Sequence, residues 1–137
     1  TKHNPRFEPP ELWVLGCVGD SFAEFMAGGI AVICGYGKER AENILGYGPC
    51  VGMVGGKIFF RGKHQGFSER DARLRKPDDE EWLWLTTRMR DFLKAIDLPK
   101  VFRHAAYFFK CRALARSVDI VFAQDTVSVG APAALAA

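Results

Sequence analysis

The residue types best suited to metal binding or nucleophilic chemistry are scattered along this chain. The 137 residues include four cysteines and three histidines, at Cys17, Cys34, Cys50, Cys111, His3, His64 and His104. No Cys-x-x-Cys pair occurs, and no histidine lies near a cysteine or a carboxylate at a recognisable ligand spacing, so a zinc or iron–sulfur site is poorly supported. The sequence therefore predicts no metal site, and it favours free thiols in a reducing cytoplasm.

Two short segments could carry other chemistry. Asp20 and Glu24 could supply an acid/base pair, and Gly46-Tyr-Gly48 is a glycine-rich loop that could approach a phosphate. However, single carboxylates between turns more often face solvent or cap the backbone, and the loop lacks the Lys-Ser/Thr sequel of a phosphate loop. These residues are the candidates if the chain is an independent enzyme or binding module. Otherwise we expect no catalytic and no cofactor-binding residue in it.

The elements that must position these residues are indicated by a repeat. The segment Met26-Ala-Gly-Gly-Ile-Ala-Val-Ile-Cys-Gly35 recurs 27 residues later as Met53-Val-Gly-Gly-Lys-Ile-Phe-Phe-Arg-Gly62, and Trp13-Val-Leu-Gly16 is a weaker copy with Gly16 19 residues before Gly35. Short strands closed by glycines at a recurring period indicate stacked coils, although two hairpin strands with glycine turns are the simpler alternative. Glycine suits sharp turns and close approaches between coils. The expected structural glycines are Gly28, Gly29, Gly35, Gly52, Gly55, Gly56 and Gly62.

Alternation along the strands assigns two faces, because successive side chains of a strand point to opposite sides. If Lys57 and Arg61 point outward, Ile58 and Phe60 point inward. The same register places Ala31, Ile33 and Val14 inside, and it places Trp13, Val32 and Phe59 on the outside. This outer column of Trp13, Val32 and Phe59 is a candidate interface that the C-terminal helices, or another protein, must cover.

The sequence divides into four parts. We expect β-helix coils over residues 1–66, a polar linker over 67–77, two helices over 78–117, and an extension over 118–137 that is poorly ordered at its end. Asp78 can cap the first helix, whose apolar stripe contains Trp82, Leu85, Met89, Phe92, Leu93 and Ile96. Pro99 lies near the start of the second helix, whose apolar face contains Val101, Phe102, Ala105, Phe108 and Phe109.

Composition restricts the partners. Hydrophobic residues make up 48% of the chain and charged residues 26%, as in soluble globular proteins. No apolar run approaches the length of a membrane span. The net charge of +3 is too weak to indicate nucleic-acid binding, although five basic residues and no acid lie between Lys100 and Arg116. Three coils are few for a free-standing stack, so we expect either further N-terminal coils or a partner that caps them.

These residues carry a resemblance. Met26-x-Gly-Gly-x-x-Val-x-x-Gly35 followed by Gly48-x-x-x-Gly52-Met53-x-Gly-Gly56 resembles the GXGXG domain at the C-terminal end of the glutamate synthase large subunit. The resemblance covers residues 12–62, and more loosely the helical tail with Phe108-Phe-Lys-Cys111. It implies mainly β structure with C-terminal helices: a partial right-handed parallel β-helix of the GXGXG type, followed by an α-helical tail.

The resemblance also implies a non-catalytic structural role in a cytoplasmic glutamate synthase-like complex. The partners would be a glutaminase (amidotransferase) and an FMN-binding synthase, and FMN and the iron–sulfur cluster would belong to those partner domains. The domain is also similar to a subunit of formylmethanofuran dehydrogenase. A scaffold in such a redox complex, with molybdenum or tungsten and iron–sulfur subunits, is the alternative.

Overall fold

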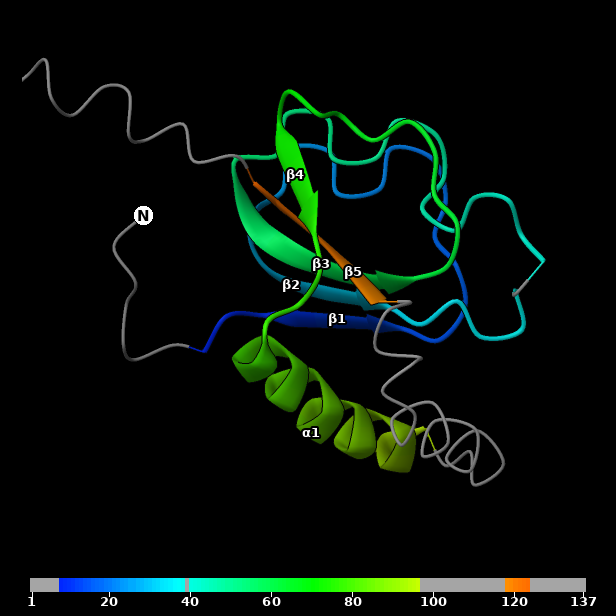
Figure 1. Ribbon diagram of the computed structural model, residues 1–137, viewed down its shortest axis with the longest axis vertical. Helices are drawn as coiled ribbons and strands as arrows, with labels where there is room; N and C mark the ends of the chain where they lie inside the picture. The colour runs from blue at the N-terminus through cyan, green and yellow to red at the C-terminus, as the bar shows by residue number, and fades with distance from the viewer. Residues whose placement is uncertain (1–7, 39, 97–117, 124–137) are drawn as a thin grey trace, which may run out of the picture.

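The computed structural model describes residues 8–38, 40–96 and 118–123. Its elements are the strands β1 (Glu11–Val14), β2 (Ala27–Ile33), β3 (Gly55–Arg61) and β4 (Ala72–Arg75), the helix α1 (Asp79–Ala95) and the strand β5 (Val118–Ala123). The five strands form one sheet in the order β1-β2-β3-β5-β4, shown in Figure 1. β1, β2 and β3 are parallel, whereas β5 is antiparallel to both β3 and β4.

The expectation of a right-handed parallel β-helix is wrong. A β-helix would continue its parallel ladder coil after coil, but here the far edge of β3 pairs with the antiparallel strand β5, which ends the parallel ladder after three strands. Within the described residues, the connections 15–26 and 34–54 contain turns and no strand, so each turn of the chain contributes a single strand. The described residues form a small mixed sheet with one helix on one face (Figure 1).

The register expected from the repeat is nevertheless confirmed. Trp13 pairs with Val32, and Val32 pairs with Phe59, so the outer column exists as aligned residues on three neighbouring strands. Ala31 likewise pairs with Ile58. The spacings of 19 and 27 residues therefore correspond to one step across the sheet, because each copy places its strand in the same register beside the previous one.

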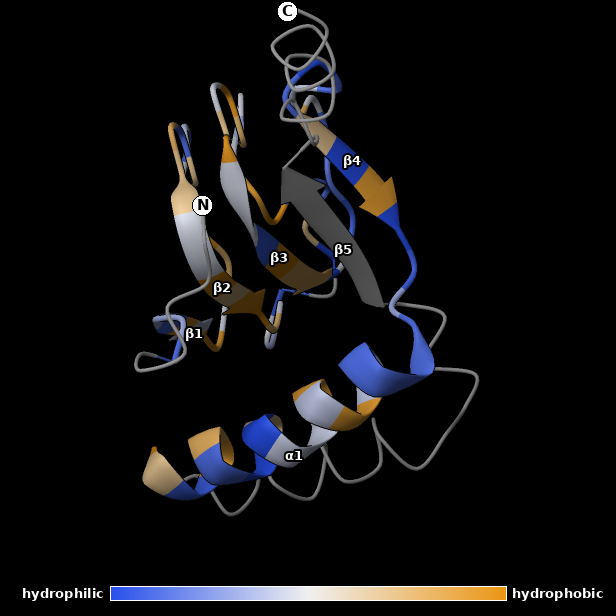
Figure 2. Ribbon diagram, turned by 90° about the vertical axis from the view of Figure 1, so that its left-hand side faces the viewer, coloured by the Kyte–Doolittle hydropathy of each residue, from blue (hydrophilic) through white to orange (hydrophobic). Residues whose placement is uncertain are grey.

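The two faces of the sheet belong to two separate apolar clusters. The face of Ala31, Ile33, Ile58 and Phe60 packs against buried residues of the connection 34–54, which are Ile44, Leu45, Cys50 and Met53. The opposite face, with Val32 and Phe59, packs against Leu85, Met89 and Leu93 of α1. Figure 2 shows α1 lying along this face of the sheet.

The sequence explains where α1 begins and which side it buries. The Asp78 side chain accepts a hydrogen bond from the backbone N–H of Glu81, and the Glu81 side chain accepts one from the backbone N–H of Asp78, which completes a capping box. The expected apolar stripe is the buried side of the helix, with Trp82, Phe92 and Ile96 partly buried around the three core residues.

The C-terminal part differs from the expected division. The segment 67–77, expected to be a linker, contains β4, and the segment 118–137, expected to be an extension, begins with β5. Both strands join the sheet because β5 fills the gap between β3 and β4. The expected second helix lies within residues 97–117, outside the described residues, as do residues 124–137.

The repeat also extends into the turns before β2 and β3. Positive φ angles occur at Ser21, Ala23 and Phe25, and 27 residues later at Gly48, Cys50 and Gly52. The two stretches lie side by side: the N–H of Ser21 donates to the carbonyl of Tyr47 at 2.9 Å, and the N–H of Cys50 donates to the carbonyl of Phe22 at 2.9 Å. The first copy thus holds three non-glycine residues in a conformation that is strained for side chains with a Cβ.

This strain predicts a stabilising substitution. Ala23 has a φ of 60°, close to the 57° of Ser21 two residues earlier. Ala23→Gly removes the clash of the Cβ, which costs about 1–2 kcal/mol. The glycine loses about 0.5–1 kcal/mol of this gain through the entropy of the unfolded chain. We expect a net stabilisation of about 0.5–1 kcal/mol, measured by urea unfolding of the full chain. The control is Ala27→Gly on β2, where φ is not positive and glycine is expected to destabilise. Destabilisation by both substitutions would contradict the strain at Ala23.

Candidate functional site

The seven expected structural glycines fall into three groups. Positive φ angles are found at Gly29, Gly35, Gly52, Gly56 and Gly62. Gly55 has no positive φ, but a Cβ there would collide with the carbonyl of Ala27 on the neighbouring strand. Gly28 differs from the expectation, because its φ is not positive and a Cβ there would meet nothing within 4 Å. Six of the seven expected glycines therefore lie at turns or close approaches of the parallel strands, and Gly28 does not.

Asp20 of the candidate acid/base pair is hydrogen-bonded to the backbone of the glycine-rich loop. The Asp20 carboxylate accepts a hydrogen bond from the backbone N–H of Tyr47 at 2.9 Å. The N–H at the centre of Gly46-Tyr-Gly48 therefore binds a carboxylate of the chain itself, which would repel a phosphate at the same place. Glu24 is exposed. Asp20 thus does what single carboxylates between turns commonly do, which is to cap a backbone donor.

A second carboxylate that sequence reasoning missed has the same role. Asp71 accepts hydrogen bonds from the Ser68 hydroxyl at 2.7 Å and from the backbone N–H of Gly52 at 3.0 Å. These bonds, led by the one from Ser68, lower the pKa of Asp71. The Ser-x-x-Asp spacing is a signal for a local side-chain bond, but the partner Gly52 is 19 residues away in sequence and is found only in the fold.

Two of the three described cysteines, Cys34 and Cys50, are unsuited to nucleophilic catalysis. Cys17 is exposed, whereas Cys34 and Cys50 are free thiols in different apolar clusters on the two sides of the sheet. Burial raises the pKa of Cys34 to about 12, against the opposing charge of Arg61, and raises the pKa of Cys50 to about 11. Thiols are poor nucleophiles until they ionise. Within the described part of the chain, no three His, Cys, Asp or Glu residues are grouped so as to hold a metal ion.

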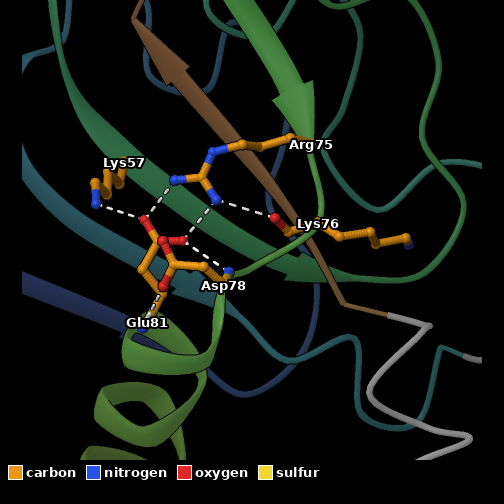
Figure 3. A network of polar contacts seen from close by, with 5 residues as sticks. All are labelled: Lys57, Arg75, Lys76, Asp78 and Glu81. Carbon is orange, nitrogen blue, oxygen red and sulfur yellow. Dashed lines mark hydrogen bonds and ion pairs between the residues drawn. The ribbon is translucent and has the colours of Figure 1, made fainter.

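The most concentrated set of charges surrounds Glu81, at the junction of β3, β4 and α1 (Figure 3). We call Lys57, Arg75, Lys76, Asp78 and Glu81 the Glu81 network. The buried Glu81 carboxylate is 2.6 Å from Lys57 Nζ and 2.6 Å from each terminal nitrogen of Arg75. It also accepts the N–H of Asp78 at 3.1 Å, and Arg75 donates to the carbonyl of Lys76 at 2.9 Å.

The geometry of the Glu81 network makes it a structural clamp. The bidentate hydrogen bond from Arg75 is the main reason that the pKa of Glu81 falls to about 2, with further help from Lys57 and Asp78 and against the cost of burial. A carboxylate that is ionised at every ordinary pH and accepts four hydrogen bonds is a poor proton acceptor for a substrate. Sequence reasoning missed this network, although Asp78-x-x-Glu81 is a capping-box spacing that could have indicated half of it.

This clamp predicts loss of stability in acid. Because the pKa of Glu81 is about 2 when folded and 4.5 ordinarily, its contribution is complete above about pH 4.5 and is lost as the pH falls toward 2. We expect Glu81→Gln to destabilise the chain by about 1–3 kcal/mol at pH 7 and to flatten the loss of stability between pH 4.5 and 2. The measurement is urea unfolding across this range. Glu80→Gln, at an exposed neighbouring position, is the control, and an equal effect of both substitutions would contradict the clamp.

The candidate interface of Trp13, Val32 and Phe59 is covered within the chain. Val32 and Phe59 are buried beneath α1, and the Trp13 ring stacks on Phe92 and Trp84, with ring centroids 5.3 Å and 6.1 Å away. The sequence allows either the C-terminal helices or another protein to cover this column. In the described structure α1 covers it, so Val32 and Phe59 are not exposed to a partner. Trp13 remains only partly buried because β1 is the edge strand.

Comparison with known proteins adds no assignment. No protein-family model matches the chain, and neither does any curated protein or any solved structure. Among the described residues, no helix has both the length and the apolar character needed to cross a membrane.

Proposed function

We propose that this chain is a non-catalytic structural component of a glutamate synthase-like complex. The observation that carries the proposal is what its carboxylates bind. Asp20 and Asp71 accept backbone N–H groups of segments distant in sequence, and Glu81 joins α1 to Lys57 of β3 and Arg75 of β4. The repeat that resembles the GXGXG domain supports the same proposal, because its glycines serve strand packing and turns.

The proposal does not depend on a β-helix, which this chain does not form. It rests on the repeat motif and on the equal register of β1, β2 and β3. The partners would be a glutaminase and an FMN-binding synthase, which would hold the FMN and the iron–sulfur cluster and carry out the chemistry. The chain would then work in the cytoplasm, and it would bind neither nucleic acid nor membrane.

The test is purification of the tagged full chain from its native host, with mass spectrometry of the proteins that come with it. Recovery of glutaminase and FMN synthase subunits supports the proposal, and Asp20→Ala and Glu24→Ala should leave the activity of that complex unchanged. Recovery of molybdenum or tungsten subunits would instead assign the chain to a formylmethanofuran dehydrogenase-like complex. A folded chain with no partner, or loss of turnover in either variant with assembly intact, would contradict a structural role.

A further inference from the structure

The outer edge of β1 presents backbone groups that nothing described in the structure satisfies. The carbonyls of Pro10 and Val14 accept hydrogen bonds from Ile30 and Cys34 on the β2 side. Backbone groups of successive residues face opposite sides of a strand, so the N–H and C=O groups of Glu11 and Trp13 point away from β2. Among residues 8–38, 40–96 and 118–123, β1 pairs with β2 alone, so neither backbone N–H has a strand beside it on the outer side. Such an edge is a template for another strand.

The side chains of β1 show the same incompleteness. Leu12, Ala31 and Ile58 are aligned on three strands, and their exposed fractions are 51%, 3% and 0%. The inner two members are buried because each has a strand on both sides, whereas Leu12 has one on a single side. An apolar side chain placed beside Leu12 would complete this row.

The turn after β1 has an open donor as well. In the second copy of the repeat, the N–H of Cys50 donates to the carbonyl of Phe22 in the preceding copy. Ala23 is the residue 27 positions earlier and has the same positive φ, but the described residues supply no carbonyl for its N–H. The open edge therefore continues from β1 into the turn. The bond from Cys50 to Phe22 shows the contact that is missing at Ala23, which is a carbonyl that accepts its N–H.

We infer that this edge docks an extended, apolar segment of a partner polypeptide, which adds a strand to the sheet beside β1. This inference rests on the proposed structural role and names the surface that serves it. Main-chain hydrogen bonds to Glu11 and Trp13 provide the attachment, and apolar side chains at two successive positions, which point to opposite faces, contact Leu12 and Trp13. A second copy joined through β1 alone would pair only four residues, about 13 Å of strand, which is small for a stable dimer. A partner that other contacts already hold in the proposed complex does not depend on this short strand alone.

The first test compares amide exchange in the free chain and in the complex purified from the native host. In the free chain, the amides of Leu12 and Val14 should be protected and those of Glu11 and Trp13 should exchange fast. In the complex, exchange at Glu11 and Trp13 should slow by about tenfold or more. Protection of these two amides in the purified chain alone, rising with its concentration, would assign the edge to a second copy and overturn the inference.

The second test removes the donor without changing the fold. Glu11→Pro and Glu11→Ala lose the same side-chain contacts, to Trp13 Nε1 and Arg88, but only the proline variant loses the outward N–H. Glu11→Pro should therefore retain at least about tenfold less partner than Glu11→Ala, with similar melting of the two full chains. Equal retention would overturn the inference.

The outcomes separate this inference from the proposed function. If glutaminase and FMN synthase are recovered but Glu11 and Trp13 stay unprotected, the structural role stands and the edge is not its interface. If different subunits are recovered and the two amides are protected, the edge inference stands and the assignment to a glutamate synthase-like complex fails. If no polypeptide protects these amides, the inference fails.

Discussion

Gly56→Val is expected to destabilise the full chain by about 2–5 kcal/mol, enough to remove much of the stability of a small domain. Gly56 has a φ of 100°, which L side chains rarely adopt. A Cβ there would lie 2.6 Å from Met26 Cε and 3.0 Å from the carbonyl oxygen of Gly29 on the adjacent strand. The methionine end can move, but the strand carbonyl cannot move without disturbing the pairing of β2 with β3.

Urea unfolding of the variant measures this loss, and Gly28→Val provides the matched control. Gly28 belongs to the earlier Gly-Gly pair of the same repeat, but it has open space around it and no positive φ. We expect the control to change stability by about 0.5 kcal/mol or less. Similar losses at Gly28 and Gly56 would show that the close approach of the strands is not the cause. In the native host, Gly56→Val should also prevent assembly, whereas Gly28→Val should not.

Phe59→Asp is expected to be the most damaging single substitution on the helix-facing side of the sheet, with a cost of about 4 kcal/mol or more. Phe59 is 1% exposed, and its ring lies 5.5 Å from that of Trp84. The substitution removes a large apolar contact and buries a carboxylate without a partner. Because α1 packs on this residue, α1 should separate from the sheet at a lower temperature than the one at which β2 and β3 separate from each other.

Thermal unfolding and amide exchange in α1 measure this effect in the full chain. Val54→Asp is the control, since Val54 is an apolar residue that is 68% exposed, and we expect it to change stability by about 0.5 kcal/mol or less. Unchanged melting of Phe59→Asp would show that Phe59 is not buried between the sheet and α1. Fast exchange throughout the sheet with a protected α1 would show that the helix does not depend on this face.

The repeat correctly predicts how the strands that carry its copies pair, but it does not predict how the sheet ends. The match of Met26–Gly35 to Met53–Gly62 correctly predicts the pairs from Ile30 to Ile33, because the two copies share their side-chain alternation there. Before Ile30 the register shifts, and Ala27 pairs with Gly55 instead of Val54. It cannot show what lies beyond β3. There the antiparallel strand β5, from a part of the chain that carries no copy of the repeat, takes the edge and ends the parallel ladder.

The polar sites divide in the same way. The sequence offers two roles for Asp20, which are acid/base chemistry and the capping of a backbone group. Its hydrogen bond from the N–H of Tyr47 is a capping bond. Glu81 belongs to the acidic segment Pro77-Asp78-Asp79-Glu80-Glu81, whose local pattern indicates only a helix start. Its partners Lys57 and Arg75 come from two different strands, and their meeting depends on where α1 docks.

The sequence by itself determined the register among β1, β2 and β3 from Ile30 onward, the outer column of Trp13, Val32 and Phe59, and the start and buried side of α1. These features follow from local spacing, since strand alternation, helix periodicity and capping act over a few residues and repeat copies behave alike. Only the tertiary structure decided the antiparallel closure by β5 and β4, the ionised clamp around Glu81 and the open edge of β1. Those features depend on contacts between segments far apart in sequence, and no local pattern encodes which distant edge or charge a segment will meet.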